Sequence, residues 1–173
     1  MSERTFEKDD IDDVFLIDDD EENTQADKYL LFNIGDEVYG IAIAHVTEII
    51  EMQKVTEVPD MPIFVKGVIN LRGRVNPVID LRLRFGMPER AHDDRTCIII
   101  VNIDSTSLGI IVDTVAEVHD ILETDIDPPP NFRNEEGKNQ YILGLGKIGE
   151  RVTILIDARK ILRREELDSI ATE

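Results

Sequence analysis

An internal repeat constrains the fold of this chain more than any other feature of its sequence. The segment Gly40–Ile49 aligns without gaps with Gly109–Val118. A second block, Arg74–Arg82, aligns with Arg151–Arg159 at a slightly larger separation, and the extra residues fit in the loop Pro128–Asn139. Two blocks in the same order, sharing Gly, Glu, Arg and Asp positions, are improbable by chance. We therefore infer two subdomains built on one plan.

Short apolar runs separated by Gly and Pro predict a mainly β fold with short helices. The expected strands and strand pairs are Tyr29–Ile34, Val38–Ile43, Ile49–Val58, Gly67–Asp80, Cys97–Ile103, Leu108–Val112, Val115–Leu122 and Tyr141–Asp157. Helical turns are expected within Ala44–Ile49 and over Leu81–Phe85, and a helical segment is expected over Ala158–Ile170. Many short strands of this kind favour small barrels, because a closed sheet has no exposed edge.

The hairpin predicted over Gly67–Asp80 contains the polar element Asn70-Leu71-Arg72-Gly73, which a plain hairpin does not require. Gly73 tolerates the positive φ that tight turns need. Arg72 keeps its charge and cannot be buried cheaply without a partner. In the repeat, Arg72 aligns with Gly149 and Asn70 with Lys147. Polar residues present in only one copy are candidates for a function, so this hairpin is the expected recognition element.

Glu48 and Glu117 occupy equivalent positions in the repeat, which leaves two interpretations of Glu48 open. A shared residue can serve the fold, or Glu48 can pair with Arg72 and orient its guanidinium. Four arginines in or near the hairpin further predict a basic cluster on an acidic protein: Arg72, Arg74, Arg82 and Arg84. For Arg82 and Arg84, scattered solvated charge is the alternative.

The net charge of −18 is distributed unevenly along the 173 residues. Residues 1–27 contain 12 acidic and 2 basic side chains, and we interpret them as a disordered acidic arm. Within it, Val14–Ile17 is either a short docking motif or a chance apolar run. Residues 164–173 are expected to form a helical tail. The acidic balance argues against nucleic acid as a partner, because phosphates need a basic surface.

Signals for catalysis, cofactors or metals are weak. Gly144–Gly149 spells a dinucleotide-binding fingerprint, but a strand follows it where that motif needs a helix. Asp18–Glu22 lacks the Gly and Glu of a calcium loop, and the three histidines have no metal-ligand spacing. Cys97 begins an apolar run, which favours a buried, inert thiol. We expect no cofactor, no metal and no enzymatic activity. No apolar run is long enough to span a bilayer, so we expect a cytoplasmic protein without direct membrane contact.

The motifs together resemble the CheW family of chemotaxis coupling proteins. The resemblance rests on Tyr39–Ile41, Val46–Ile49, Phe64–Gly73, Pro77–Arg82 and, in the second half, Gly109–Asp113 and Tyr141–Gly146. It covers residues 28–163 and leaves the acidic arm outside. The resemblance implies two SH3-like five-stranded β-barrel subdomains, intertwined and divided approximately into residues 28–90 and 91–163.

The resemblance also implies the partners and the site. A CheW-like adaptor joins the cytoplasmic tip of methyl-accepting chemoreceptors, at the inner face of the membrane, to the regulatory domain of the histidine kinase CheA. Residues expected at the receptor interface are Val46, Glu48, Ile49, Gly67, Asn70, Arg72 and Val118. Those expected at the kinase interface are Gln53, Lys54, Val55, Thr56 and Glu57. The alternatives are an adaptor of another chemosensory pathway and, less favoured, a nucleotide-binding enzyme.

Overall fold

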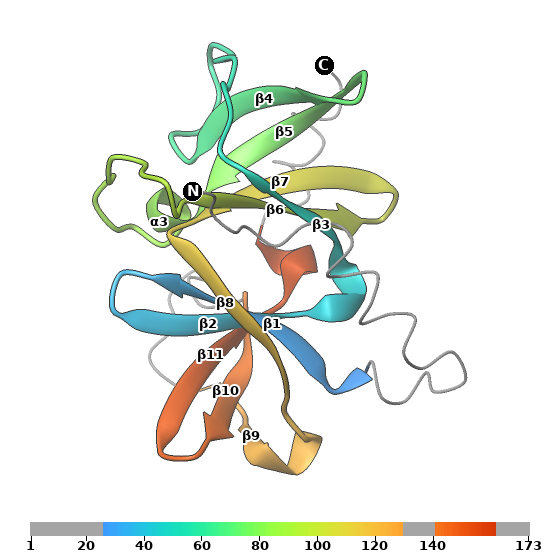
Figure 1. Cartoon of the computed structure of the whole chain (residues 1–173), viewed down its shortest axis with the longest axis vertical. Helices are drawn as coiled ribbons and strands as arrows, with labels where there is room; N and C mark the ends of the chain where they lie inside the picture. The colour runs from blue at the N-terminus through green and yellow to red at the C-terminus, as the bar shows by residue number, and fades with distance from the viewer. Residues whose placement is uncertain (1–25, 130–140, 162–173) are drawn as a thin grey trace. The chain divides into compact units, whose positions relative to one another are not determined.

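A computed structural model describes residues 26–129 and 141–161 of the chain (Figure 1). The predicted acidic arm and helical tail lie almost entirely outside these ranges. The described residues form a mainly β protein with two sheets, as the sequence predicted. The helical elements within the described ranges are the short helix α3 (Leu81–Arg84) and three 3-10 turns: η1 (Ile43–His45), η2 (Glu123–Asp125) and η4 (Ala158–Lys160).

The first sheet has five strands in the order β3-β6-β7-β5-β4. Their bounds are β3 (Val46–Glu51), β4 (Val65–Leu71), β5 (Arg74–Asp80), β6 (Cys97–Ile103) and β7 (Thr106–Val112). Strand β3 begins before the predicted Ile49 and ends before the predicted Val58, because sheet pairing stops at Glu51 except for an isolated bridge at Thr56. A register shift between Val46 and Glu48 marks a bulge near its start.

The second sheet has six strands in the order β8-β1-β2-β11-β10-β9. Their bounds are β1 (Lys28–Ile34), β2 (Glu37–Ala42), β8 (Thr114–Asp120), β9 (Ile126–Asp127), β10 (Ile142–Ile148) and β11 (Arg151–Ile156). The first five strands of this order correspond one by one to the strands of the first sheet, with β8, β1, β2, β11 and β10 in the places of β3, β6, β7, β5 and β4, and β9 is added at the edge.

The registers confirm the internal repeat. Each sheet has one parallel pair, β5 with β7 and β11 with β2. Ile79 pairs with Ile110 in the first sheet, and Ile156 pairs with Ile41 in the second. The alignment of the sequence blocks makes Ile79 equivalent to Ile156 and Ile110 equivalent to Ile41. The repeat therefore reproduces the pairing of strands as well as their composition.

The chain divides into two compact units that combine strands from both halves of the repeat. Among the described residues, the first unit spans 46–115, and the second contains 26–45, 116–129 and 141–161. This division differs from the boundaries near residue 90 that the resemblance implied. The reason is an exchange: β1 and β2 belong to the sheet of β8–β11, whereas β6 and β7 belong to the sheet of β3–β5.

In each sheet, the segment that follows one edge strand pairs with a strand at the opposite edge. After β3, Thr56 forms an antiparallel bridge to Val68 on β4, with backbone hydrogen bonds of 2.9 Å in both directions. After β8, β9 pairs with β10 in the same way. Such edge-to-edge pairing is what a small barrel requires. The assignment to the SH3-like class remains a prediction.

Each unit has its own hydrophobic core. The core of the first unit contains Ile69, Val78, Ile98, Ile100 and Ile111. The core of the second contains Tyr29, Leu31, Val38, Ile121 and Leu155. The continuous apolar run at the start of β6 is buried along its whole length, as expected for a central strand covered on both faces. Each such side chain contributes about 1.5–3 kcal/mol on burial.

The aspartate shared by the two copies has a structural role. The Asp80 side chain accepts a hydrogen bond from the Arg82 backbone N–H at 2.9 Å, where α3 begins. Asp157 accepts from the Arg159 backbone N–H at 3.0 Å, where η4 begins. Both are N-caps, which satisfy an otherwise unpaired donor of the first helical turn. The shared Asp therefore serves the fold, as the repeat indicated.

Alkaline pH is expected to destabilise the protein. Burial raises the pKa of the Cys97 thiol and of the Tyr29 and Tyr39 phenols above their ordinary values. A group with a raised pKa in the folded state stabilises the protein fully below the pKa of the unfolded state, and that contribution is lost as the pH rises through the folded pKa. Thermal unfolding measured from pH 7 to 11 should show a falling Tm above about pH 8.5, where an unfolded thiol ionises. A Tm that stays level to pH 11 would contradict this expectation.

Candidate interaction site at the β4–β5 hairpin

The hairpin of β4 and β5 (green in Figure 1) is closed by a two-residue loop, Arg72–Gly73. Leu71 pairs with Arg74, and both loop residues have positive φ, 52° at Arg72 and 86° at Gly73. This combination is typical of a type I′ turn, whose twist matches that of the flanking strands. Glycine adopts such a φ freely, but an arginine does so at a cost of about 1–2 kcal/mol.

Asn70 holds this turn together. Its side-chain Oδ1 accepts a hydrogen bond from the Gly73 backbone N–H at 2.9 Å. Asparagine commonly makes local bonds of this kind in turns. Asn70 is exposed, so it is available to a partner, but its visible contact is structural.

The equivalent hairpin of the second unit uses different loop chemistry. Its loop is Gly149–Glu150, and only Gly149 has a positive φ, 62°. Glycine at the first loop position is the pattern of a type II′ turn. The hairpin loop of the second copy therefore forms with a glycine, which has no side chain, at the position of Arg72. The arginine is a departure from what the shared fold requires, and backbone strain of this kind clusters at functional sites.

Arg72 forms an ion pair with Glu48 across the first unit. The Arg72 Nη2 donates to the Glu48 Oε2. Glu48 lies on β3 with 4% of its surface exposed, whereas 66% of the Arg72 side chain is exposed. A buried carboxylate needs a charged or hydrogen-bonding partner, and here that partner is an arginine whose remaining donors reach solvent. The buried carboxylate of Glu48 thus fixes the orientation of the exposed guanidinium of Arg72.

Glu117, the equivalent of Glu48 in the repeat, is exposed on β8. The two glutamates therefore do not share a structural role. Of the two interpretations left open by the sequence, the structure supports the pairing of Glu48 with Arg72.

Gly67 serves the closure of the first sheet. Its φ is 143°, and a Cβ there would overlap the Thr56 carbonyl oxygen and lie 2.7 Å from the Thr56 carbonyl carbon. A register shift in the β4–β5 pairing occurs at the same position. Gly144, the equivalent residue of the second copy, combines a similar register shift with close neighbours, because a Cβ there would lie 2.7 Å from the Ile126 side chain and 2.8 Å from the Asp127 carbonyl oxygen. A glycine repeated in the same setting serves the fold.

The segment expected to face the kinase follows β3. Gln53, Lys54, Thr56 and Glu57 are exposed, and Val55 packs against the core of the first unit. The Thr56 bridge fixes this segment beside β4. It is therefore a tethered, mostly polar surface strip.

The apolar residues expected at the receptor interface have different surroundings. Val46 and Ile49 are buried on β3, with 4% and 3% of their surfaces exposed, so they do not form surface anchors in this structure. Val118 is partly buried and lies on β8 of the second unit. Within the first unit, the structure thus brings together Glu48, Arg72, Asn70, Gly67 and the strip 53–57.

The prediction of a basic cluster of four exposed arginines is wrong for Arg82, which is paired with an aspartate. Arg82 has only 16% of its side chain exposed and makes two hydrogen bonds to Asp113, from Nε at 2.9 Å and from Nη2 at 2.8 Å. Arg84 lies over the Phe64 ring, with its guanidinium carbon 5.1 Å from the ring centre. Asp113 was missed by the sequence reasoning, although it aligns with Ala44 in the other copy and so carries the signal of a polar residue unique to one half.

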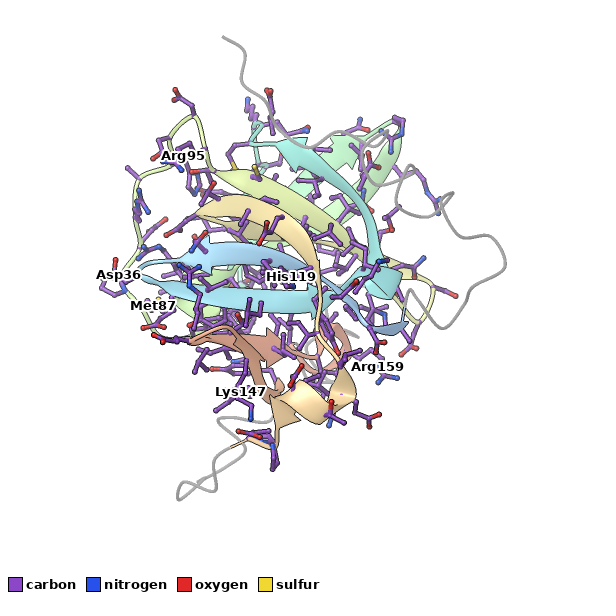
Figure 2. All side chains as sticks on the ribbon, turned by 60° about the horizontal axis from the view of Figure 1, so that its bottom comes forward. Asp36, Met87, Arg95, His119, Lys147 and Arg159 are labelled. Atoms are coloured by element: carbon purple, nitrogen blue, oxygen red, sulfur yellow. The ribbon has the colours of Figure 1, made fainter. Side chains whose placement is uncertain are left out.

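The glycine run 144–149 lies in β10 and its hairpin loop, as the repeat predicted, and not at the start of a helix (Figure 2 labels Lys147 on this strand). Within the described ranges, no group of three or more His, Cys, Asp or Glu side chains lies close enough together to hold a metal ion. The same residues include no helix long and apolar enough to cross a membrane. Cys97 is buried, as expected for an inert thiol.

These features define a class of protein: a duplicated, mainly β scaffold that presents an oriented arginine on one of two related hairpins. Comparisons with known proteins identify the family. A family model described as a CheW-like domain matches residues 28–166. The chain is 40% identical over 144 residues to the chemotaxis protein CheW of Klebsiella aerogenes, covering 83% of this chain and 86% of that protein.

It is also 34% identical to the chemotaxis protein CheW of Helicobacter pylori, covering 84% of this chain and 87% of that protein. A crystal structure of the scaffolding protein TtCheW from Thermoanaerobacter tengcongensis superposes with a TM-score of 0.74 at 35% identity, covering 82% of this chain and 95% of that one. The chain belongs to the CheW family. The expectation of a chemotaxis coupling adaptor is thereby confirmed.

Proposed function

We propose that this chain couples the cytoplasmic tip of methyl-accepting chemoreceptors to the regulatory domain of the histidine kinase CheA, and that Arg72 is a principal receptor contact. The observation that carries the proposal is the Glu48–Arg72 pair: a buried carboxylate holds an exposed guanidinium in a strained turn that the second copy does without. A guanidinium fixed in this way offers several donors in a set geometry, which suits recognition of carboxylates and carbonyls on a helical partner.

The proposal assigns the strip 53–57 to the kinase. Its four exposed side chains and its tether to β4 support a docking surface that keeps its shape when the receptor binds next to it. We infer that the chain acts without catalysis, by holding two partners together at the cytoplasmic face of the membrane, where receptors recruit it. Individually weak contacts of this kind gain strength from the multivalency of an array.

Replacing Arg72 with alanine is expected to reduce receptor control of kinase activity by at least about tenfold, which corresponds to about 1.4 kcal/mol of lost coupling. Removing the guanidinium takes away the receptor contact and leaves Glu48 buried without its partner. The measurement is receptor-dependent phosphorylation in a reconstituted mixture of receptor fragment, kinase and adaptor.

A second variant, Glu48→Gln/Arg72→Ala, removes the unpaired charge and separates loss of contact from loss of stability. Arg95→Ala is the matched control, because Arg95 is an exposed arginine on the loop before β6 (labelled in Figure 2). Both Arg72 variants should fail in coupling while the control retains it. Full coupling by Glu48→Gln/Arg72→Ala would refute the role assigned to Arg72.

A further inference from the structure

The second unit contains a hollow of about 500 Å³ that the proposed function does not use. Its lining is mostly apolar and includes Tyr29 on β1, Ile121 after β8 and Leu143 on β10. All the lining residues belong to this one unit. Sites for small molecules typically have volumes of about 300–1,000 Å³ and apolar walls with a few polar groups. The size and lining of the hollow therefore match those of a small-molecule site.

Backbone pairing fixes the walls of the hollow. The Ile121 backbone N–H donates to the Asp27 carbonyl oxygen at 2.8 Å, which ties the residue after β8 to the residue before β1. On another side, β9 pairs with β10, and Ile126 lies opposite Gly146 (Figure 1). Glu123 begins the turn η2, which leads from β8 to β9. The hollow is therefore preformed, which spares a ligand the cost of ordering its walls.

The Tyr29 hydroxyl is a buried polar group that faces the hollow. Only 7% of the Tyr29 surface is exposed, and its ring packs in the core of the second unit. Burial raises the pKa of Tyr29, and the nearby charges of Asp27 and Glu123 raise it further. Because both carboxylates line the hollow, the phenol oxygen lies toward it. This hydroxyl makes no hydrogen bond to any residue of 26–129 or 141–161, although a buried tyrosine usually has a partner.

The internal repeat shows that the shared fold does not require this hydroxyl. Tyr29 pairs with Ala42, and Ile98 pairs with Ile111 in the first sheet. The aligned sequence blocks make Ala42 equivalent to Ile111, so Tyr29 is equivalent to Ile98. Ile98 is fully buried and has no polar side-chain atom. The phenol is therefore a feature of the second unit alone, beyond what the common core needs.

Three carboxylates surround the hollow: those of Asp27, Glu123 and Asp127. They are spread around it, because no three acidic side chains in the described part of the chain are close enough together to hold a metal ion. Asp127 lies 3.6 Å from the Lys147 ammonium, whereas Asp27 and Glu123 form no ion pair with a described residue. Separated negative charges around apolar walls favour a ligand that combines positive charge with an apolar body.

We propose that this hollow binds a small organic cation, an ammonium or guanidinium group carried on an apolar body. The cationic group lies between Asp27 and Glu123 and donates a hydrogen bond to the Tyr29 hydroxyl oxygen. The apolar body packs against Ile121 and Leu143. This site goes beyond the proposed function and does not depend on the role of Arg72.

A titration of the full-length chain with 2-phenylethylamine, followed by methyl NMR, tests the site without any partner protein. The methyl signals of Ile121, Ile126 and Leu143 should shift and saturate, with a Kd of about 1 mM or tighter for a ligand of this size. The signals of Ile69 and Val78, in the core of the first unit, should stay in place. The uncharged analogue 2-phenylethanol should bind at least about fivefold more weakly, because it loses two charge contacts. Absence of saturable shifts, or equal binding of the two compounds, would overturn the proposal.

Three variants locate the cation. Asp27→Asn/Glu123→Gln should weaken binding of 2-phenylethylamine about fivefold. Tyr29→Phe keeps the ring in the core and should weaken binding about threefold, through loss of one hydrogen bond. The matched control Asp36→Asn/Glu37→Gln removes two exposed carboxylates at the β1–β2 turn of the same unit and should bind as the parent does (Figure 2 labels Asp36). Unchanged affinity in Asp27→Asn/Glu123→Gln, or an equal loss in the control, would refute the assignment of the cation to this hollow.

Discussion

Replacing Gly67 with alanine is expected to lower the free energy of unfolding by about 2–5 kcal/mol. The φ of 143° at Gly67 is strained for any residue with a side chain, and a Cβ there would meet the backbone of Thr56 and Glu57. A positive φ costs about 1–2 kcal/mol, and forcing atoms into a packed position costs about 1–3 kcal/mol more. Urea unfolding should show a lower midpoint at an unchanged slope.

Gly73→Ala is the matched control for this prediction. Gly73 also has a positive φ, 86°, but no atom lies within 4 Å of a Cβ placed there. Its replacement should therefore cost only the backbone contribution of a positive φ, about 1–2 kcal/mol. Equal losses in the two variants would show that contact with Thr56, and hence closure of the first sheet, contributes nothing to stability.

The repeat predicted the architecture of each sheet but not the exchange of strands between them. The aligned blocks fix which positions are equivalent, and the parallel pairs Ile79–Ile110 and Ile156–Ile41 follow that equivalence. However, the same alignment is compatible with β1 and β2 pairing in either sheet. The choice depends on contacts between residues far apart in the sequence, which local patterns do not record. For this reason the boundary near residue 90 differed from the observed division.

The candidate site was predicted in part, for a similar reason. Comparison of the two copies singled out Arg72, and the structure pairs it with Glu48 as one interpretation proposed. The same comparison missed the structural hydrogen bond that Asn70 accepts from the Gly73 backbone N–H, because a polar residue unique to one copy can serve either a partner or a turn. It placed Arg82 on the surface, since sequence alone did not show that β5 and β7 end side by side and bring Asp113 to it.

The two hairpins show how duplication separates fold from function. Gly67 and Gly144 occupy equivalent bulges, and Asp80 and Asp157 both cap helical turns, so these shared residues maintain the common architecture. The loops differ: Arg72–Gly73 carries a strained arginine, whereas Gly149–Glu150 begins with an unstrained glycine. The loop position of Arg72 is therefore one that the common architecture does not fix, which is consistent with the role proposed for it.

Replacing Asp113 with alanine is expected to lower the free energy of unfolding by about 2–3 kcal/mol, somewhat less than the cost of breaking a fully buried ion pair, because this pair is partly buried. Asp113 accepts hydrogen bonds from Arg82 and from Arg90, the latter at 2.8 Å, and only 12% of its side chain is exposed. The hydrogen bond to Asp113 raises the pKa of Arg82 above its ordinary value in the folded protein. A guanidinium is not deprotonated in proteins, so Arg82 also stays charged when Asp113 is removed. Chemical unfolding of the variant measures the loss.

Two variants distinguish a buried charge effect from a general loss of packing. Arg90→Ala removes a half-exposed partner of Asp113 and should cost less than about 1 kcal/mol, because exposed ion pairs contribute little. Arg82→Met/Asp113→Leu replaces both buried charges by apolar side chains and should recover most of the stability lost in Asp113→Ala. If the double variant is as unstable as Asp113→Ala, unpaired charge is not the cause. The Arg82–Asp113 pair would then be needed for the geometry of its hydrogen bonds, which join the ends of β5 and β7 and reach the Pro88 carbonyl of the following loop.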